Sequence, residues 1–279
     1  MIDLRSKLLT KADPMTCSTL TLFREAIMSG DVILPKISYN EFLSAFDYWI
    51  ANGVNNLSNL HLYTKEVCVG TTHFIDNLIM QYGLDNIQIL EHDYFYYSRL
   101  NPKKQWAEVG RLDPNQPLLI AMPFPGYGDV HPLMQDILRE CLDKNIAIHI
   151  DACWMSSAHN ITFDFSHPCI HSVGFSLSKG LDLGWNRIGV RYTKQINSTD
   201  SITIANQFCT INQVDISIGY LYMQEFSQNY LWQRYGNTYN KICQQLLLRP
   251  TKCIHMARTF DTGKVIGLKN AIHYYDSLE

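Results

Sequence analysis

The chain has 279 residues, of which 46% are hydrophobic and 18% are charged. This composition excludes disorder as a description of the whole chain and allows one large core or two modest domains. The net charge is −3, and the 23 Lys and Arg residues are scattered without a basic stripe, so nucleic acid is not expected as a partner. No apolar run approaches the roughly 20 residues that cross a bilayer, and the first residues lack an apolar signal core. We therefore expect a cytoplasmic protein with a small-molecule substrate and no membrane partner.

Eight cysteines stand singly in the sequence, mostly within apolar stretches. Single cysteines in such surroundings are typical of buried free thiols in a reducing compartment. The sequence has no C-x-x-C pair, although the triplets at 169–171 and 253–255, both Cys-Ile-His, could place a thiol and an imidazole on one face of a strand. We do not expect a metal.

From about residue 65 the sequence alternates between strand-like and helix-like segments. The patterns predict strands over residues 65–70, 86–91, 117–122 and 145–150, and helices over 72–81 and 133–142. Strands separated by helices predict an α/β fold with a mixed, mostly parallel central sheet flanked by helices.

Two further β-type runs, residues 170–175 and 187–192, follow and are joined by a glycine-containing turn. After residue 200 the chain is mainly helical by pattern, with one apolar stripe over residues 212–232. The tail predicts a strand over 253–257 and a helix over 265–275.

Chemistry-bearing side chains gather in two segments. Asp151 stands at the carboxyl end of the strand predicted at 145–150, and residues 176–189 contain a hydroxyl, a lysine and an arginine in close succession. Ligands of open α/β sheets bind outside the carboxyl ends of the strands, so both segments could border one cleft.

These two segments resemble those of pyridoxal-phosphate (PLP) enzymes of the aspartate-aminotransferase fold, also called fold type I. The family's lysine motif is approximately Ser-x-Ser/Ala-Lys, followed eight positions later by an arginine. Ser176, Lys179 and Arg187 match it without a gap, and Asp151 with Trp154 match the upstream Asp-x-x-aromatic motif. The resemblance covers about residues 65–195.

The resemblance implies a role for each matching residue. Lys179 would hold PLP as a Schiff base and then move a proton. Asp151 would keep the pyridine nitrogen of PLP protonated. The phosphate would be bound by Ser176, Ser178 and Arg187, and by the turn Gly70-Thr71-Thr72 at a strand-to-helix junction.

Two further family positions lie between the phosphate turn and Asp151. Tyr94 is the best placed of four neighbouring aromatic residues to stack on the cofactor. At the second position the family has an asparagine that donates to the phenolic oxygen of PLP, and this chain has Pro125, which has no side-chain donor. The family's tyrosine for the same oxygen falls on Trp154. With both groups changed, we predict that lysine-bound PLP titrates differently here than in an ordinary transaminase.

The activity that the resemblance favours is transamination of an amino acid or related primary amine. Arg258 resembles the arginine that holds the substrate carboxylate in the family, with Arg234 and Arg249 as rivals. Other PLP chemistry at Cα, such as decarboxylation, elimination or an oxidative step, stays open, as does a degenerate PLP-binding protein without transaminase activity.

The resemblance also implies a domain plan and a homodimer. Residues 65–205 would form the core of the large PLP-binding domain, and residues 1–64 and 206–279 would form helical flanks and an abridged small domain, since 279 residues are few for this family. Family dimers lend residues to each other's phosphate sites, and Tyr39 or Tyr63 could have that role.

Overall fold

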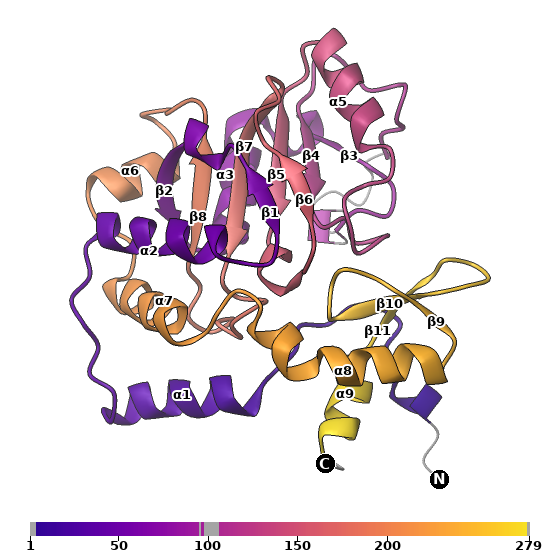
Figure 1. Cartoon of the computed structure of the whole chain (residues 1–279). Helices are drawn as coiled ribbons and strands as arrows, with labels where there is room; N and C mark the ends of the chain where they lie inside the picture. Colours follow the sequence, from indigo (N-terminus) through magenta and orange to yellow (C-terminus); the bar gives the residue numbers. More distant parts are fainter. Residues whose placement is uncertain (1–3, 95, 98–105, 278–279) are drawn as a thin grey trace.

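The computed structural model describes residues 4–94, 96–97 and 106–277, and its centre is a six-stranded sheet (Figure 1). The strand order is β2-β8-β7-β5-β4-β3. β3, β4, β5 and β7 run parallel, whereas β8 is antiparallel to both of its neighbours, β7 and β2. The strands are β2 (Thr64–Cys68), β3 (Gln88–Ile89), β4 (Leu118–Ala121), β5 (Ile148–Ala152), β7 (Ile170–Ser176) and β8 (Gly189–Thr193).

Helices cover both faces of this sheet because successive strand residues point to opposite sides. On one face Phe46 of α2 (Tyr39–Ala51) packs against Phe175 and Tyr192. On the other face Phe74 of α3 (Gly70–Tyr82) lies over Gly174, where an added Cβ would come within 2.6 Å of the ring. The remaining helices of this part are α5 (Met134–Asp143), α6 (Ser201–Gln207) and α7 (Gln213–Glu225).

A smaller antiparallel sheet lies beside the C-terminal helices and the N-terminal segment (Figure 1). Its order is β11-β10-β9, and the backbone of Leu9 bonds to Gly267 at its edge. Its strands are β9 (Leu248–Pro250), β10 (Met256–Thr259) and β11 (Val265–Gly267), and the helices beside it are α8 (Tyr230–Gln245) and α9 (Lys269–Asp276). α1 (Ser18–Ser29) instead packs against α7 through Phe23 and Tyr222.

Short elements complete the described chain. β1 (Asn56–Ser58) pairs with β6 (Thr162–Asp164) in parallel. Single 3-10 turns lie at Leu4–Lys7, Leu60–Leu62, Leu84–Asn86 and Met155–Ser157. None of the helices in the described residues is long and apolar enough to cross a membrane.

The structure confirms the expected α/β class with a mostly parallel sheet and corrects the C-terminal elements. Residues 265–275 are not one helix, because Val265–Gly267 pairs with β10 and α9 begins only at Lys269. The strand predicted at 253–257 starts at Met256. The domain boundaries at residues 65 and 205 stay a prediction.

Two other expected elements have shifted bounds. The stripe over 212–232 is divided between α7 and α8, since Phe226 is extended and its carbonyl accepts a hydrogen bond of 2.7 Å from the Trp49 indole. The strand expected from residue 145 begins at Ile148, because Asn145 has a φ of 55° in the turn after α5.

Candidate active site

A cavity of about 800 Å³ contains the lysine singled out by the sequence. Lys179, Tyr94, Trp154, Pro125 and Arg258 all contribute to its wall. The amine nitrogen of Lys179 lies 5.6 Å from the centre of the Trp154 ring. This volume is within the range of small-molecule sites, and its wall combines aromatic surface with an amine and a guanidinium.

Asp151 lies at the carboxyl end of β5 and is 2% exposed. Its Oδ2 accepts a hydrogen bond of 2.8 Å from the Tyr97 hydroxyl, and its Oδ1 accepts one of 3.0 Å from the Cys153 N–H. Burial raises the pKa of Asp151, while these two bonds, the Thr71 side chain and the charge of Lys179 act in the opposite direction. A cationic group beside this carboxylate would stabilise its ionised form.

The start of α3 presents hydrogen-bond donors that no side chain caps. Gly70 begins the helix with a φ of 65°, and an added Cβ would lie 3.2 Å from the Ser176 hydroxyl oxygen. The hydroxyls of Ser176 and Ser178 are 2.7 Å apart. Arg187 donates to the Thr72 hydroxyl at 2.8 Å. We call these five residues, together with Thr71, the anion cradle, because N–H groups, hydroxyls and a guanidinium are typical ligands of a phosphate.

Electrostatic interactions connect the cradle with the cavity. Burial raises the pKa of Tyr94 to about 12, with further increases from Cys153 and Asp151 and an opposing effect from Arg187. Burial raises the pKa of Cys153 to about 11, and the charge of Asp151 acts in the same direction. Lys179, Thr71 and Arg187 act in the opposite direction. The residues predicted from separate motifs are therefore neighbours in the structure.

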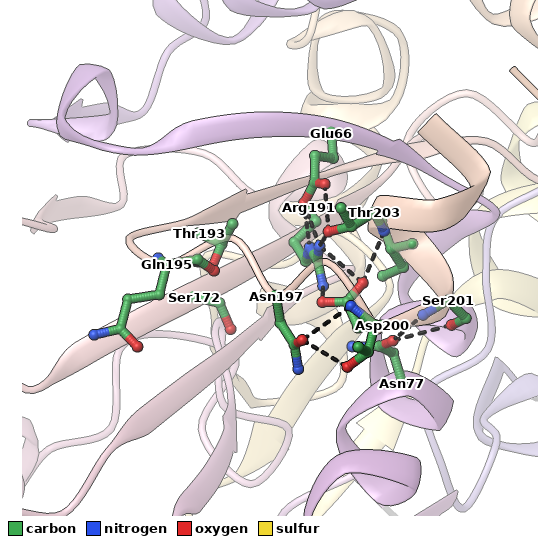
Figure 2. Close-up of polar contacts among 12 residues, drawn as sticks. Glu66, Asn77, Ser172, Arg191, Thr193, Gln195, Asn197, Asp200, Ser201 and Thr203 are labelled. Carbon is green, nitrogen blue, oxygen red and sulfur yellow. Dashed lines mark hydrogen bonds and ion pairs between the residues drawn. The ribbon is translucent and has the colours of Figure 1, made fainter. Parts of the chain in front are cut away.

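A buried ion network lies on the strands that lead into the cradle (Figure 2). Arg191 of β8 pairs with Glu66 of β2 and, at 2.8 Å, with Asp200 before α6. Thr203 bonds to both Arg191 and Glu66, at 2.9 Å and 2.7 Å. Asn77 of α3 accepts hydrogen bonds from Ser201, so the network extends from the sheet through α6 to α3.

Arg258 of β10 is held at the cavity from two sides. Its Nε donates to the Gly263 carbonyl at 2.9 Å, and its guanidinium lies 4.7 Å from the centre of the Tyr127 ring. Its rivals lie outside the cavity wall: Arg234 pairs with Asp276, and Arg249 lies 5.3 Å from the Phe260 ring. Of the three arginines, only Arg258 lines the cavity that contains Lys179.

Several residues of the site were not predicted from the sequence. Tyr97 holds Asp151, and its spacing of three from Tyr94 is a signal that could have identified it. Asp93 binds the Ala121 N–H at 3.2 Å, and burial raises its pKa to about 8. The segment from Thr10 to Pro14 forms one wall of the cavity, and no motif marks it.

Tyr39 and Tyr63, which could contribute to a partner subunit's phosphate site, form hydrogen bonds within this chain. The Tyr63 hydroxyl donates to Phe165 at 2.7 Å in the core. The Tyr39 hydroxyl donates to the Ile211 carbonyl and accepts from its N–H. Both hydroxyls have partners within this chain, and a role of either tyrosine in a partner's site stays a prediction. Among the described residues, no group of three or more His, Cys, Asp or Glu side chains could hold a metal ion.

The fold is that of the PLP-dependent fold type I enzymes, as structural comparison shows. Aspartate aminotransferase from Thermus thermophilus (a double mutant) superposes with a TM-score of 0.58 at 13% identity, covering 89% of this chain and 75% of that one. A PLP-bound C-S lyase from Staphylococcus hominis, complexed with L-cycloserine, gives 0.60 at 11% identity, covering 89% and 72%. Tyrosine aminotransferase from Leishmania infantum gives 0.59 at 13%, covering 88% and 78%. No protein-family model matches the sequence, and no curated protein is significantly similar to it in sequence.

Proposed function

We propose that this protein is a PLP-dependent, aminotransferase-like enzyme that acts on an amino acid or related primary amine through Lys179. The observation that carries the proposal is that Lys179 lines the cavity, while buried Asp151, Lys179 and the cradle residues Thr71 and Arg187 all affect the pKa of the same thiol, that of Cys153. The set of groups fits PLP, because the cradle offers donors for a phosphate, Asp151 offers a carboxylate for a pyridinium and Lys179 offers an amine for an aldehyde. Trp154 lines the same cavity as Lys179, and its indole N–H would be a donor for a ligand oxygen.

When bound, PLP withdraws electrons from the bonds at Cα of an attached amine. The protein's own groups would do the rest. Asp151 would keep the ring nitrogen protonated, and the Tyr94 ring would lie against the ring face. Lys179 would hold PLP through its aldehyde, and once a substrate amine occupies that place its Nζ would move the proton away from Cα. Arg258 would hold the substrate carboxylate through its guanidinium.

The proposal is tested by adding PLP, reducing with borohydride and mapping the labelled peptide. We expect a visible absorbance band and label on Lys179 alone. Lys179→Ala should abolish the label, whereas Lys194→Ala should retain it. Lys194 is a matched control because its amine also lies over an aromatic ring, 5.4 Å from the centre of Tyr63. Label on other lysines with none on Lys179 would overturn the proposal.

The reaction is tested with a panel of amino acids and a 2-oxo acid acceptor. Transamination predicts loss of the visible band with each productive amino acid and its recovery with the acceptor. The C-S lyase shares the fold, so elimination is the second candidate; it would release ammonia without an acceptor. A protein that is trapped by borohydride yet responds to no amine would be a PLP-binding protein without this activity.

We also propose a cytoplasmic homodimer. All eight cysteines are free, as expected in a reducing compartment. Trp185, on the loop between Lys179 and Arg187, is 88% exposed, and an exposed indole beside a site is typical of an interface. Sedimentation equilibrium should give twice the chain mass, and Trp185→Ser should shift the protein toward the monomer. A wild-type monomer at every concentration tested would contradict the dimer.

A further inference from the structure

His255 lies behind the cavity wall and is fully buried. It directly precedes β10, the strand that carries Arg258. Its Nδ1 accepts a hydrogen bond of 2.9 Å from the Met15 N–H, so in the neutral ring the proton is on Nε2. Burial lowers the pKa of His255 to about 3, and the charges of Lys179 and Lys269 contribute in the same direction. The ring is therefore neutral, and the backbone of Met15 fixes its tautomer.

The protonated edge of the ring is unusual. Nε2 is buried and has no hydrogen-bond partner among the residues that the structure describes. A buried N–H without a partner is destabilising, so such a group in a folded protein calls for a reason. The imidazole packs against Trp154, whose ring lies edge-to-face with it at a centroid distance of 4.6 Å and an interplanar angle of 76°.

Trp154 in turn contacts the amine of Lys179, 5.6 Å from the ring centre. A continuous series of contacts thus runs from the Met15 backbone through His255 and Trp154 to Lys179. An indole face stabilises an ammonium only when it is turned toward the charge. Trp154 both packs against the imidazole and lines the cavity, so the imidazole is in a position to fix how the indole faces the amine.

We propose that His255 is a positioning residue that holds the Trp154 indole against the Lys179 amine. Met15 locks the imidazole, and the imidazole fixes the indole. This inference uses the proposed function only in naming Lys179 as the reacting amine.

The test measures how fast Lys179 reacts with acetic anhydride in protein without PLP, with the labelled peptides quantified by mass spectrometry. Acetic anhydride reacts only with a neutral amine. A cation–π contact stabilises the charged ammonium, so loss of an aligned contact favours the neutral, reactive form. We expect His255→Leu to raise the rate at neutral pH about threefold, the ratio that corresponds to a contact of ordinary strength. Trp154→Leu should give a similar increase, and adding His255→Leu to it should change nothing further.

His149→Leu is the matched control. His149 is also buried, its Nε2 also has no partner in the described residues, and its ring faces Tyr82 instead of Trp154. This variant should leave the Lys179 rate unchanged. If His255→Leu does not fold, His255→Gln replaces it in the same experiment, since Gln keeps an acceptor for Met15 but removes the ring.

Two results would overturn the proposal. One is an equal effect of the His255 substitution with and without Trp154, which would indicate a general change in accessibility. The other is an effect no larger than that of His149→Leu. Because no PLP is present, neither result depends on whether borohydride traps PLP on Lys179.

Discussion

Replacing Tyr97 with Phe tests how far the hydroxyl bond stabilises the ionised form of Asp151. The change removes a single hydroxyl where both side chains are buried, Tyr97 at 1% and Asp151 at 2% exposure. The Cys153 N–H remains as a donor to the other carboxylate oxygen. Burial raises the pKa of Asp151 and the Tyr97 bond opposes that rise, so the variant raises the pKa of Asp151 further.

The sign of the pH effect follows from linkage. Because the folded-state pKa of Asp151 is above its unfolded value, ionisation of Asp151 destabilises the fold increasingly as the pH rises through the folded-state pKa. Tyr97→Phe enlarges this effect. A hydrogen bond to a charged group contributes about 1.5–3 kcal/mol and one to a neutral group about 0.5–1.5 kcal/mol. The free energy of unfolding should therefore fall by up to about 1.5–3 kcal/mol at about pH 8 and by less at about pH 4, because the protonated fraction of the carboxyl increases as the pH falls.

Urea denaturation at the two pH values measures both losses. Tyr96→Phe is the control, since Tyr96 also lines the cavity whereas the bond to Asp151 comes from Tyr97; it should cost less than about 0.5 kcal/mol at either pH. If Tyr97→Phe destabilised the protein equally at both pH values, the bond to Asp151 would not be acting on the ionised form, and the reasoning would be refuted.

Three other predictions concern the cradle, the ion network and the substrate arginine. Gly70→Ala should lower stability by about 1–2 kcal/mol through its positive φ and weaken PLP binding in a fluorescence titration. Gly110→Ala also has a positive φ but nothing within 4 Å, so it should affect stability alone. Arg191→Leu leaves two buried carboxylates without their cation and should cost about 3–5 kcal/mol in urea denaturation, against less than about 1 kcal/mol for exposed Arg111→Leu. Arg258→Leu should raise KM for the amino acid at least tenfold and leave the PLP spectrum unchanged; an unchanged KM would remove Arg258 from the substrate site.

The parts of the site that follow from local sequence could be predicted. Asp151 stands at the end of an apolar strand, and the cradle glycine stands at a strand-to-helix junction, so neighbouring residues determine both positions. Lys179 and Arg187 occupy the same loop, which keeps their spacing visible in the sequence. The central strands are recognisable because β4 and β5 are buried throughout: β4 consists of apolar residues, and in β5 apolar residues alternate with His149 and Asp151.

The parts of the site that depend on tertiary contacts could not be predicted from the sequence. The bond from Tyr97 to Asp151 joins residues 54 positions apart, and that from Met15 to His255 joins residues 240 apart. The hairpin of β10 and β11 has strands of four and three residues, too short for a two-residue alternation to be distinguished from the start of a helix. In each case the partner, and not the local pattern, decides the structure.

The pairing of β2 with β8 has a consequence for the order of folding. Cys68 is opposite Gly189 in this ladder, so the two halves of the anion cradle meet only when segments about 120 residues apart along the chain come together. During synthesis the first half, at the start of α3, leaves the ribosome long before β8 exists. The start of α3 can therefore join the rest of the cradle only after β2 has paired with β8, a long-range contact that forms late. The ability to bind a phosphate should appear last, as a sign that the central sheet is complete.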